Sequence, residues 1–398
     1  MSGERLIRYP ELRALEDAAY GGGVMPSRIF ALLLPVWCVE IRATVTEAED
    51  YELIDRYLEK AIAEADLHTT AELAGFFGLD RVVVDRALRF LTAIEHVAVD
   101  GDRFTLTELG KRSVRDQKSY RVTVNDRRKL YFDGYGSRPL TRPYYDSSAV
   151  TFLDPADLST VAGRDGPSFT TLANMSHGFR HEALADLASR SDRDAFNLPA
   201  RIDNPDSLRE TMVHLPIYLV RGLRRGGRPH YLAYSQIDDQ ADLYLSELCE
   251  QTPEIVGVCE NDAGPGTGVG RERITEWLRK RNLNGRGPEL VAGGMWRVTF
   301  PASAFTGSLK LSQVGSFVVL GNTFFHVWCA DRRTRQAALV ERLDAYLGSR
   351  SHVDEEVVRL RLTRLNTQLE LDADLPTAHQ WAVAFGKTTL AEQLASFC

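Results

Sequence analysis

The sequence of 398 residues has few cysteines and no long apolar run. The longest apolar run, residues 29–37, is far short of the ~20 residues that span a bilayer, and it starts too far from the N-terminus for a signal peptide. The cysteines are odd in number and include no CxxC pair: Cys38, Cys249, Cys259, Cys329 and Cys398. This excludes a cysteine-rich zinc site and argues against a disulfide framework. We therefore expect a cytoplasmic protein without membrane contact, in which residues 29–37 are buried.

Lysine is also scarce, because only seven of the 48 basic residues are lysine and 41 are arginine. So strong a bias is typical of a GC-rich genome, and an arginine alone is weak support for phosphate binding. The formal net charge is −7, whereas a protein that coats nucleic acid is normally basic. The average hides an asymmetry, since residues 103–142 contain eleven Lys and Arg against four Asp and Glu. Basic charge is concentrated in this stretch, and the rest of the chain carries −14.

The common catalytic motifs are missing. The sequence contains no GxSxG, no histidine followed two positions later by lysine, and no glutamate followed two positions later by lysine. Residues 386–388 read Gly-Lys-Thr, but Trp381 stands where a P-loop requires glycine. Without the histidine and lysine, residues 309–328 are at most a degenerate relative of a phospholipase-D-like fold. We expect no catalytic residue of a recognised class.

Two further patterns have a simple structural interpretation. Residues 264–270 are glycine-rich and lie between an expected strand and an expected helix, but they lack the lysine of a P-loop. A flexible connection is favoured, although Arg271 and Arg273 leave anion binding open. His177 and His181 are four residues apart, but the sequence has no HExxH and no evident third ligand. We expect neither a metal nor a cofactor.

Residues 51–116 contain a series of local helix and hairpin signals. Residues 51–65 carry an apolar stripe of helical period, and Thr69 with Glu72 matches a capping box before a short second helix. Gly78 is placed to end that helix, and Asp80 to cap a third helix with Val84, Ala87, Leu88 and Leu91 on one face. Alternating residues around Asp100-Gly101 then predict a hairpin.

This order of elements, closed by FTLTELG at residues 104–110, resembles the winged-helix domains of bacterial regulators. The resemblance covers roughly 65 residues and is specific for the fold but weak for function. It implies that the third helix enters the major groove through Arg81, Arg86 and Arg89, and that the wing contacts backbone. Asp85 lies among these arginines and would repel a phosphate. A merely solvated face, or one that docks a protein, is the alternative.

The stretch behind the wing is the stronger candidate for phosphate contact. Its predicted nucleic-acid-binding residues are Arg103, Lys111, Arg112, Arg115, Lys118, Arg121, Arg127, Arg128 and Lys129. Strands over 120–124 and 128–132, with a turn at Asn125-Asp126, predict a small antiparallel extension. The interleaved aromatic residues are either stacking platforms for bases or, as we favour, parts of a core: Tyr120, Tyr131, Phe132, Tyr135, Tyr144 and Tyr145.

The expected fold class is α+β multidomain. We predict an N-terminal segment (1–50) packing on the winged helix (51–116), a basic β extension (117–153), a partly ordered linker (154–210), an α+β domain (211–348) and a helical C-terminal region (349–398). Expected strands lie at 212–220, 231–234, 255–259, 296–300, 317–320 and 324–328. Expected helices lie at 178–189, 239–249, 271–283, 334–347 and 375–397. Residues 357–365 fit either a strand or a helix.

Three functions are consistent with these patterns. The first is a non-enzymatic, DNA-binding accessory subunit that binds backbone and shape and assembles with protein partners or with itself. By analogy alone, such proteins are similar to components of bacterial regulatory, defence or mobile-element systems. The second is a ligand-responsive transcription regulator. The third is an enzyme with an unrecognised site in 211–348, with Asp262, His326 or Asp331 as candidates.

Overall fold

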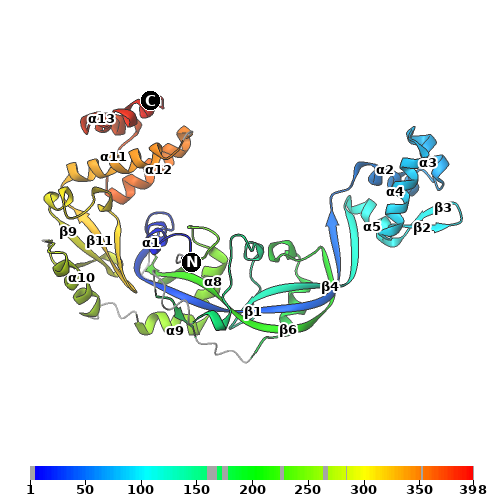
Figure 1. Ribbon diagram of the computed structural model, residues 1–398, viewed down its shortest axis with the longest axis horizontal. Helices are drawn as coiled ribbons and strands as arrows, with labels where there is room; N and C mark the ends of the chain where they lie inside the picture. Colours follow the sequence, from blue (N-terminus) through cyan, green and yellow to red (C-terminus); the bar gives the residue numbers. More distant parts are fainter. Residues whose placement is uncertain are drawn as a thin grey trace. The chain divides into compact units, whose positions relative to one another are not determined.

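The computed structural model describes residues 5–158, 168–172, 178–224, 228–262, 268–283, 285–350 and 353–397 (Figure 1). Over these residues the protein is a mixed α+β fold with 13 α-helices, three open sheets and a helical C-terminal region. The chain divides into two compact units. Unit 1 comprises Met1–Pro35, Ser147–Met175 and Val213–Cys398, and unit 2 comprises Val36–Asp146 and Ser176–Met212. No helix in the described part is long and apolar enough to cross a membrane.

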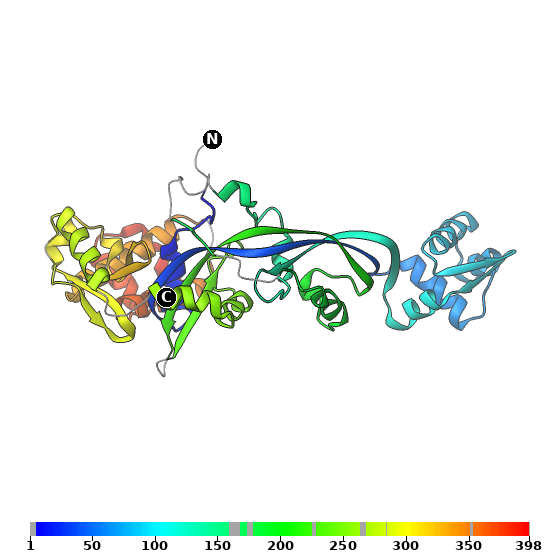
Figure 2. The same ribbon diagram turned by 90° about the horizontal axis from the view of Figure 1, so that it is seen from below.

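Unit 2 contains the helices and hairpin expected between residues 51 and 116. They are α2 (Leu53–Glu64), α3 (Thr70–Phe77), α4 (Arg81–Ala93), β2 (Val97–Asp100), β3 (Arg103–Leu106) and α5 (Glu108–Asp116). The β2–β3 hairpin projects from the helices in both views (Figures 1 and 2). We call residues 51–116 the helix–hairpin module. Its core consists mainly of Leu58, Ile62, Leu73, Val84, Leu88, Leu91 and Val97.

The local signals that predicted these elements are confirmed. Thr69 and Glu72 form the capping box of α3, in which each side chain accepts from the other residue's backbone N–H. Gly78 ends α3 with a left-handed φ of 64°. Asp80 caps α4 by accepting from the N–H of Val82 at 2.8 Å. These contacts span only a few residues, which is why the sequence alone was sufficient to predict them.

The expected extension differs from the observed strand. Instead of two strands around a turn, Ser119–Asp133 form one strand, β4, which pairs antiparallel with β1 (Met25–Glu49). Asn125 adopts a φ of 58°, and the register shifts on the facing strand between Ala43 and Val45. The left-handed asparagine therefore makes a bulge in a continuing strand and not a hairpin turn. On its other edge, β1 neighbours β6 (Arg201–Leu223), so β1 and β6 each contribute residues to both units.

The N-terminal segment, predicted to pack on residues 51–116, is divided between the two units, with Met1–Pro35 in unit 1 and the rest in unit 2. Helix α1 (Glu11–Tyr20) belongs to unit 1, where Leu15 shares an apolar cluster with Ile29, Tyr234 and Phe324. These partners come from β1, β7 (Pro229–Tyr234) and β11 (Thr323–Cys329). The contacts join residues hundreds of positions apart, and no local pattern predicts them. The expectation that residues 29–37 are buried is confirmed, apart from the half-buried Trp37.

The region 154–210, predicted as a partly ordered linker, contains several elements. They are two 3₁₀ turns, η2 (Pro155–Asp157) and η3 (Arg193–Phe196), the short strand β5 (Thr170–Thr171), helix α7 (Glu182–Ser189) and the beginning of β6. Leu184, Leu187 and Phe196 are buried. Despite its polar composition, this region therefore contains buried apolar residues, and it is divided between unit 1 and unit 2.

The rest of unit 1 comprises a second sheet and its surrounding helices. Its strands run in the order β10-β11-β9-β8, with β8 (Glu289–Val291), β9 (Met295–Phe300) and β10 (Phe317–Leu320). Its helices are α8 (Leu243–Glu250), α9 (Pro253–Asp262), α10 (Gly268–Lys280), α11 (Arg332–Gly348), α12 (Glu355–Leu369), α13 (Leu375–Ala384) and α14 (Thr388–Ala395). One apolar cluster contains residues from α10, β9, β11 and α11–α14. The predicted α+β domain and helical C-terminal region therefore share a core.

One expected strand in this region was wrong, and one open choice is settled. Residues 255–259 lie in α9, where Ile255 and Cys259 are buried four positions apart, as on one face of a helix. Residues 357–365 are helical within α12, with Val358, Leu362 and Leu365 buried. Short apolar runs fit both periods, and in these cases tertiary burial selected the helix.

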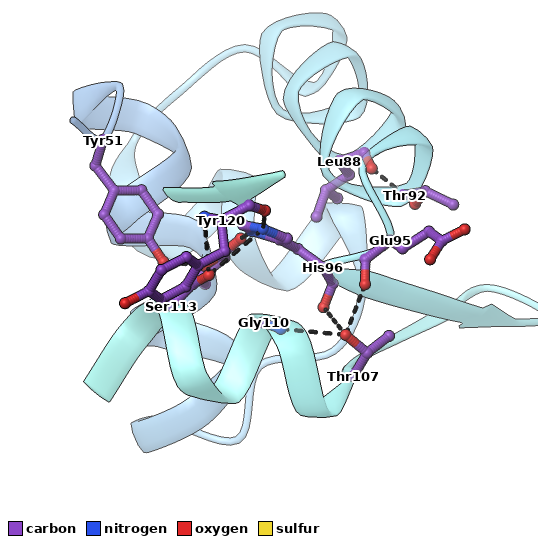
Figure 3. A network of polar contacts seen from close by, with 10 residues as sticks. Tyr51, Leu88, Thr92, Glu95, His96, Thr107, Gly110, Ser113 and Tyr120 are labelled. Atoms are coloured by element: carbon purple, nitrogen blue, oxygen red, sulfur yellow. Dashed lines mark hydrogen bonds and ion pairs between the residues drawn. The ribbon is translucent and has the colours of Figure 1, made fainter. Parts of the chain in front are cut away.

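The start of α5 lies against the backbone that precedes β2. Thr107 caps α5 by accepting from the N–H of Gly110 at 3.1 Å, and its hydroxyl lies 2.6 Å from the carbonyl oxygen of Glu95 (Figure 3). A Cβ atom at Gly110 would lie 2.2 Å from the carbonyl oxygen of His96. The close approach explains in physical terms why threonine and glycine occupy these positions of the LTELG stretch.

We expect Gly110→Ala to destabilise the protein by about 1–3 kcal/mol, because the added methyl group overpacks a backbone contact. Gly75→Ala is the matched control, since Gly75 lies in α3 with open space around its Cα. Alanine there removes a helix-interior glycine and should stabilise by about 0.5–1 kcal/mol. Urea unfolding of both variants tests this pair, and equal effects would refute the close approach.

Candidate nucleic-acid interface

The outward face of α4 carries the three arginines predicted to enter the major groove. Arg81, Arg86 and Arg89 are exposed, whereas Val84 and Leu88 on the opposite face are buried. Arg89 forms an ion pair with Asp85 one turn earlier. Among the described residues, neither Arg81 nor Arg86 has an acidic group within ion-pair distance. Asp85 therefore neutralises one arginine of this face and leaves two available.

The hairpin adds one more cation. Arg103 begins β3, is exposed, and likewise has no acidic partner within the described part of the chain. The hairpin is held to the helices because the N–H of Phe104 donates to the carbonyl of His68 at 2.7 Å. Arg103 thus has a backbone that is held in place and an exposed side chain.

The cations of α5 are paired within their own helix. Lys111 lies 2.7 Å from Glu108, and Asp116 lies 3.5 Å from Arg112 and 3.2 Å from Arg115. The guanidinium of Arg112 also lies 4.4 Å from the ring centroid of Tyr120. Exposed pairs of this kind contribute little to stability, but they reduce the positive potential that a phosphate would meet.

The basic residues of β4 face acidic residues of β1. Lys118 lies 2.6 Å from Asp50, and Arg121 lies 3.7 Å from Glu49. Arg128 pairs with both Glu47 and Asp126. Such pairs neutralise charges within the two antiparallel strands β1 and β4, which we call the β1–β4 ribbon. The basic stretch considered in the sequence, residues 103–142, does not include the acidic residues at positions 47–50. Only the pairing of β1 with β4 shows that these acids lie beside the basic residues.

Seven of the twelve predicted nucleic-acid-binding residues therefore take part in ion pairs: Arg89, Lys111, Arg112, Arg115, Lys118, Arg121 and Arg128. Within the described chain, five show no ion pair: Arg81, Arg86, Arg103, Arg127 and Lys129. In the β1–β4 ribbon, acidic residues of β1 neutralise basic residues of β4. The module of residues 51–116 has thirteen acidic residues against nine Lys and Arg, a formal charge of −4. Among the described residues of the module, the cations without an ion pair are Arg81 and Arg86 on α4, Arg103 on β3 and Arg56 on α2, whose guanidinium donates to Gln117 Oε1 at 2.6 Å.

Most of the aromatic residues near the ribbon have a structural role. Tyr120, Phe132 and Tyr144 are buried, which confirms the preferred core interpretation for these three. The rings of Tyr131 and Tyr145 lie 5.1 Å apart, and the Tyr145 hydroxyl accepts from the N–H of Tyr131 at 3.1 Å. Tyr131, Tyr135 and Tyr145 are half-buried, so none of the six predicted rings is exposed for stacking with bases.

A buried ion pair inside the module places His96 against the Tyr120 carbonyl of β4, and Figure 3 shows His96, Ser113 and Tyr120 side by side. His96 and Glu59 are both fully buried, with His96 Nδ1 2.5 Å from Glu59 Oε1. His96 Nε2 faces the carbonyl oxygen of Tyr120, and Ser113 Oγ lies 3.4 Å from the same nitrogen. Both ring nitrogens face oxygen acceptors, so the doubly protonated imidazolium satisfies both. Although burial alone would lower it, these hydrogen bonds raise the pKa of His96.

The candidate catalytic residues of unit 1 have structural partners. His326 is buried, with Nε2 3.3 Å from the Tyr20 hydroxyl and Nδ1 accepting from Arg297 Nε at 3.2 Å. Burial and the nearby Arg297 lower the pKa of His326 to about 3. Asp331 caps α11 by accepting from the N–H of Thr334 at 2.8 Å. The backbone of Asp262 ends α9, and its side chain lies outside the described atoms.

The remaining sequence patterns show no ligand geometry. Lys387 lies 2.8 Å from Asp344 and 3.0 Å from Glu341, so it serves the packing of α11 rather than a phosphate loop. His181 lies 3.4 Å from Glu210, while His177 and residues 264–267 lie outside the described residues. Over the part of the chain that the structure describes, no group of three or more His, Cys, Asp or Glu is arranged to hold a metal ion.

Comparison with known proteins adds no identification: no family model, curated protein or solved structure matches the chain.

We expect His326 to remain neutral between about pH 5 and 8, because its pKa lies far below that range. The unfolded histidine binds a proton near its ordinary pKa of about 6.5, so this residue removes stability as the pH falls below that value. An NMR titration checks the prediction. His68, whose pKa is raised by hydrogen bonds to Asp66 and to the Phe104 carbonyl, titrates in the same spectra as a control. A His326 signal that moves near pH 6.5 would contradict the structural role.

Proposed function

We propose that residues 51–116 form a winged-helix module and that the protein is a non-enzymatic, DNA-binding accessory subunit that assembles with protein partners. The order of α2, α3, α4 and the β2–β3 hairpin supports the winged helix. One observation supports the contact surface above others: Arg81, Arg86 and Arg103 are the exposed cations of the candidate interface that have no acidic partner within the described module.

This proposal moves the contact from the basic stretch to α4 and the hairpin. The sequence favoured the basic residues 118–129 as phosphate contacts, but most of them form ion pairs with Glu47, Glu49 and Asp50. An ion-paired cation must first exchange its carboxylate partner for a phosphate, so it gains less on binding than a free one. Arg127 and Lys129 are the two exceptions in β4 and form a secondary contact surface in this proposal.

The charge of the module limits the expected affinity. With a formal charge of −4 it repels a polyanion at long range, and the three cations of α4 and the hairpin that lack an ion pair provide few phosphate contacts. The module alone is therefore a weak DNA binder. Weak binding by the module is sufficient for an accessory subunit, because a partner that binds the same DNA holds the module at a high effective concentration.

A second function has one observation in its favour. A ligand-responsive transcription regulator requires a small-molecule site, and unit 1 contains a cleft of about 640 Å³. This function predicts a discrete operator and an affinity that changes with ligand. Selection of bound sequences from random duplex DNA separates the two functions, since an accessory subunit that reads backbone and shape yields no single consensus.

The contact surface is tested by fluorescence anisotropy with a labelled duplex over a range of salt concentrations. We expect the triple variant Arg81→Ala, Arg86→Ala, Arg103→Ala to reduce the slope of log affinity against log salt by about 3, one unit for each lost phosphate contact. Charge neutralisation of the paired residues, Arg115→Ala, Lys118→Ala, Arg121→Ala, removes the same charge and serves as the control.

The control variant should change the slope by less than about 1, because its cations are already neutralised within the protein. If the slope fell more in the control than in the α4–hairpin variant, the basic stretch, and not α4 and the hairpin, would be the DNA contact. Binding of the unmodified chain that does not weaken with salt would refute electrostatic contact altogether.

A further inference from the structure

Strand β4 lies at one end of the sheet ordered β4-β1-β6-β7, and part of its outer edge is free. Along residues 121–129 its backbone pairs with β1, and no other group among the described residues hydrogen-bonds to the backbone of this stretch. Further along, the Leu140 N–H donates to the Tyr131 carbonyl at 2.8 Å, and a bridge joins Phe132 to Pro139. The free part of the edge therefore lies between α5 and this bridge, where its unpaired N–H and C=O groups can pair with a further strand.

The side chains of the same stretch are open to solvent. Every residue from Arg121 to Asn125 is exposed, although Tyr120 directly before them is buried. Val122 and Val124 occupy alternate positions and are 37% and 66% exposed. Valine favours strands because its branched side chain packs against cross-strand neighbours. A free edge with exposed valines is therefore suited to strand pairing.

Proteins protect a free strand edge with charged side chains or with a bulge. On β4 these features flank the valines: Asn125 adopts the left-handed conformation of the bulge, and Arg127 and Lys129 follow it. Arg121, on the other side, forms an ion pair with β1. Residues 122–124 carry no charge and lie before the bulge. Pairing at these residues is thus open but limited to a short segment.

This segment is complementary to a second copy of itself. Two identical strands related by a two-fold axis pair antiparallel, and residues directly opposite one another share a face of the sheet. An axis at Thr123 sets Val122 of each copy opposite Val124 of the other, and Arg121 opposite Asn125. The valine pair forms twice and Thr123 meets itself, with no like charges opposed over these five residues. Cross-strand pairs of this kind stabilise antiparallel strands.

The neighbouring registers are less favourable. An axis at Val124 sets Arg121 opposite Arg127, and like charges directly opposite destabilise a strand pair. An axis at Arg121 sets this arginine opposite itself. An axis at Val122 opposes Val124 to Tyr120, whose ring is buried within its own chain and offers no surface to a second copy. The register centred on Thr123 is therefore preferred.

We propose that two copies of the protein associate through the free edges of β4, antiparallel and about a two-fold axis at Thr123. The contact is short, because the bulge at Asn125 interrupts the strand, so the dimer is reversible and depends on concentration. The inference goes beyond the proposed DNA contact and is independent of it, since Arg81, Arg86 and Arg103 take no part in the dimer.

Sedimentation velocity of the full-length protein between about 1 and about 100 µM, the range of weak interfaces, tests for the dimer. Val124→Lys brings a charge to the edge and should raise the dissociation constant at least about tenfold. The matched control is Val383→Lys on α13, because Val383 is 59% exposed and lies in unit 1. We expect the control to change the constant by less than about twofold. Thermal unfolding verifies that both variants remain folded.

Cysteine cross-linking of the full-length protein tests the register. In Thr123→Cys the two Cα atoms lie about 4.5–5.5 Å apart across the pair, within the range that a disulfide spans, so oxidation should yield a covalent dimer. In Arg127→Cys the two cysteines lie roughly 27 Å apart along the strands and should not cross-link. The unmodified chain, oxidised in the same way, gives the background from the natural cysteines.

Three results would overturn the proposal. A protein that stays monomeric over the whole concentration range would exclude a second copy from this edge. A dimer that Val124→Lys leaves intact would place the contact elsewhere on the protein. Equal cross-linking of Thr123→Cys and Arg127→Cys would exclude the axis at Thr123.

Discussion

The buried ion pair between Glu59 and His96 fixes the helix–hairpin module to the strand that follows it. Glu59 belongs to α2, His96 precedes β2, and the second ring nitrogen of His96 faces the Tyr120 carbonyl at the start of β4. The Tyr51 hydroxyl donates to the other carboxylate oxygen of Glu59 at 2.5 Å. Removing one partner of such a buried pair costs about 3–5 kcal/mol, because the other charge is left unpaired. The direction in which α5 and β4 leave the module depends on this junction.

The distribution of charge decides how unit 2 would meet nucleic acid. Residues 103–142 appear strongly basic in the sequence because this stretch does not include residues 47–50. In the fold, Glu47, Glu49 and Asp50 form ion pairs with basic residues of that stretch. Once these pairs form, Arg81 and Arg86 on α4 and Arg103 on β3 remain as exposed cations of the predicted contact surface without an ion pair among the described residues. The proposed contact is therefore small, and it agrees with a subunit that depends on partners for its affinity.

The sequence predicted what short-range contacts determine. The Thr69–Glu72 capping box, the Gly78 terminus and the Asp80 cap were all evident, since each involves residues at most four positions apart. Pairing between distant segments was not evident. The placement of α1 in unit 1, the β1–β4 ribbon and the helical state of residues 255–259 all depend on partners far away in the chain. The same limit applies to the candidate interface, because no local pattern predicts that the carboxylates of β1 lie beside the basic residues of β4.

The most direct test of this account is the NMR titration of His96 in the unmodified chain and in Glu59→Gln. The account predicts that the pKa of His96 lies above its ordinary value in the unmodified chain and falls when the carboxylate is neutralised. Because the folded pKa is raised, the stabilisation is fully present below about pH 6.5 and is lost as the pH rises through the folded pKa. A His96 that titrates at or below its ordinary value while Glu59 is intact would contradict the ion pair and its role as the junction.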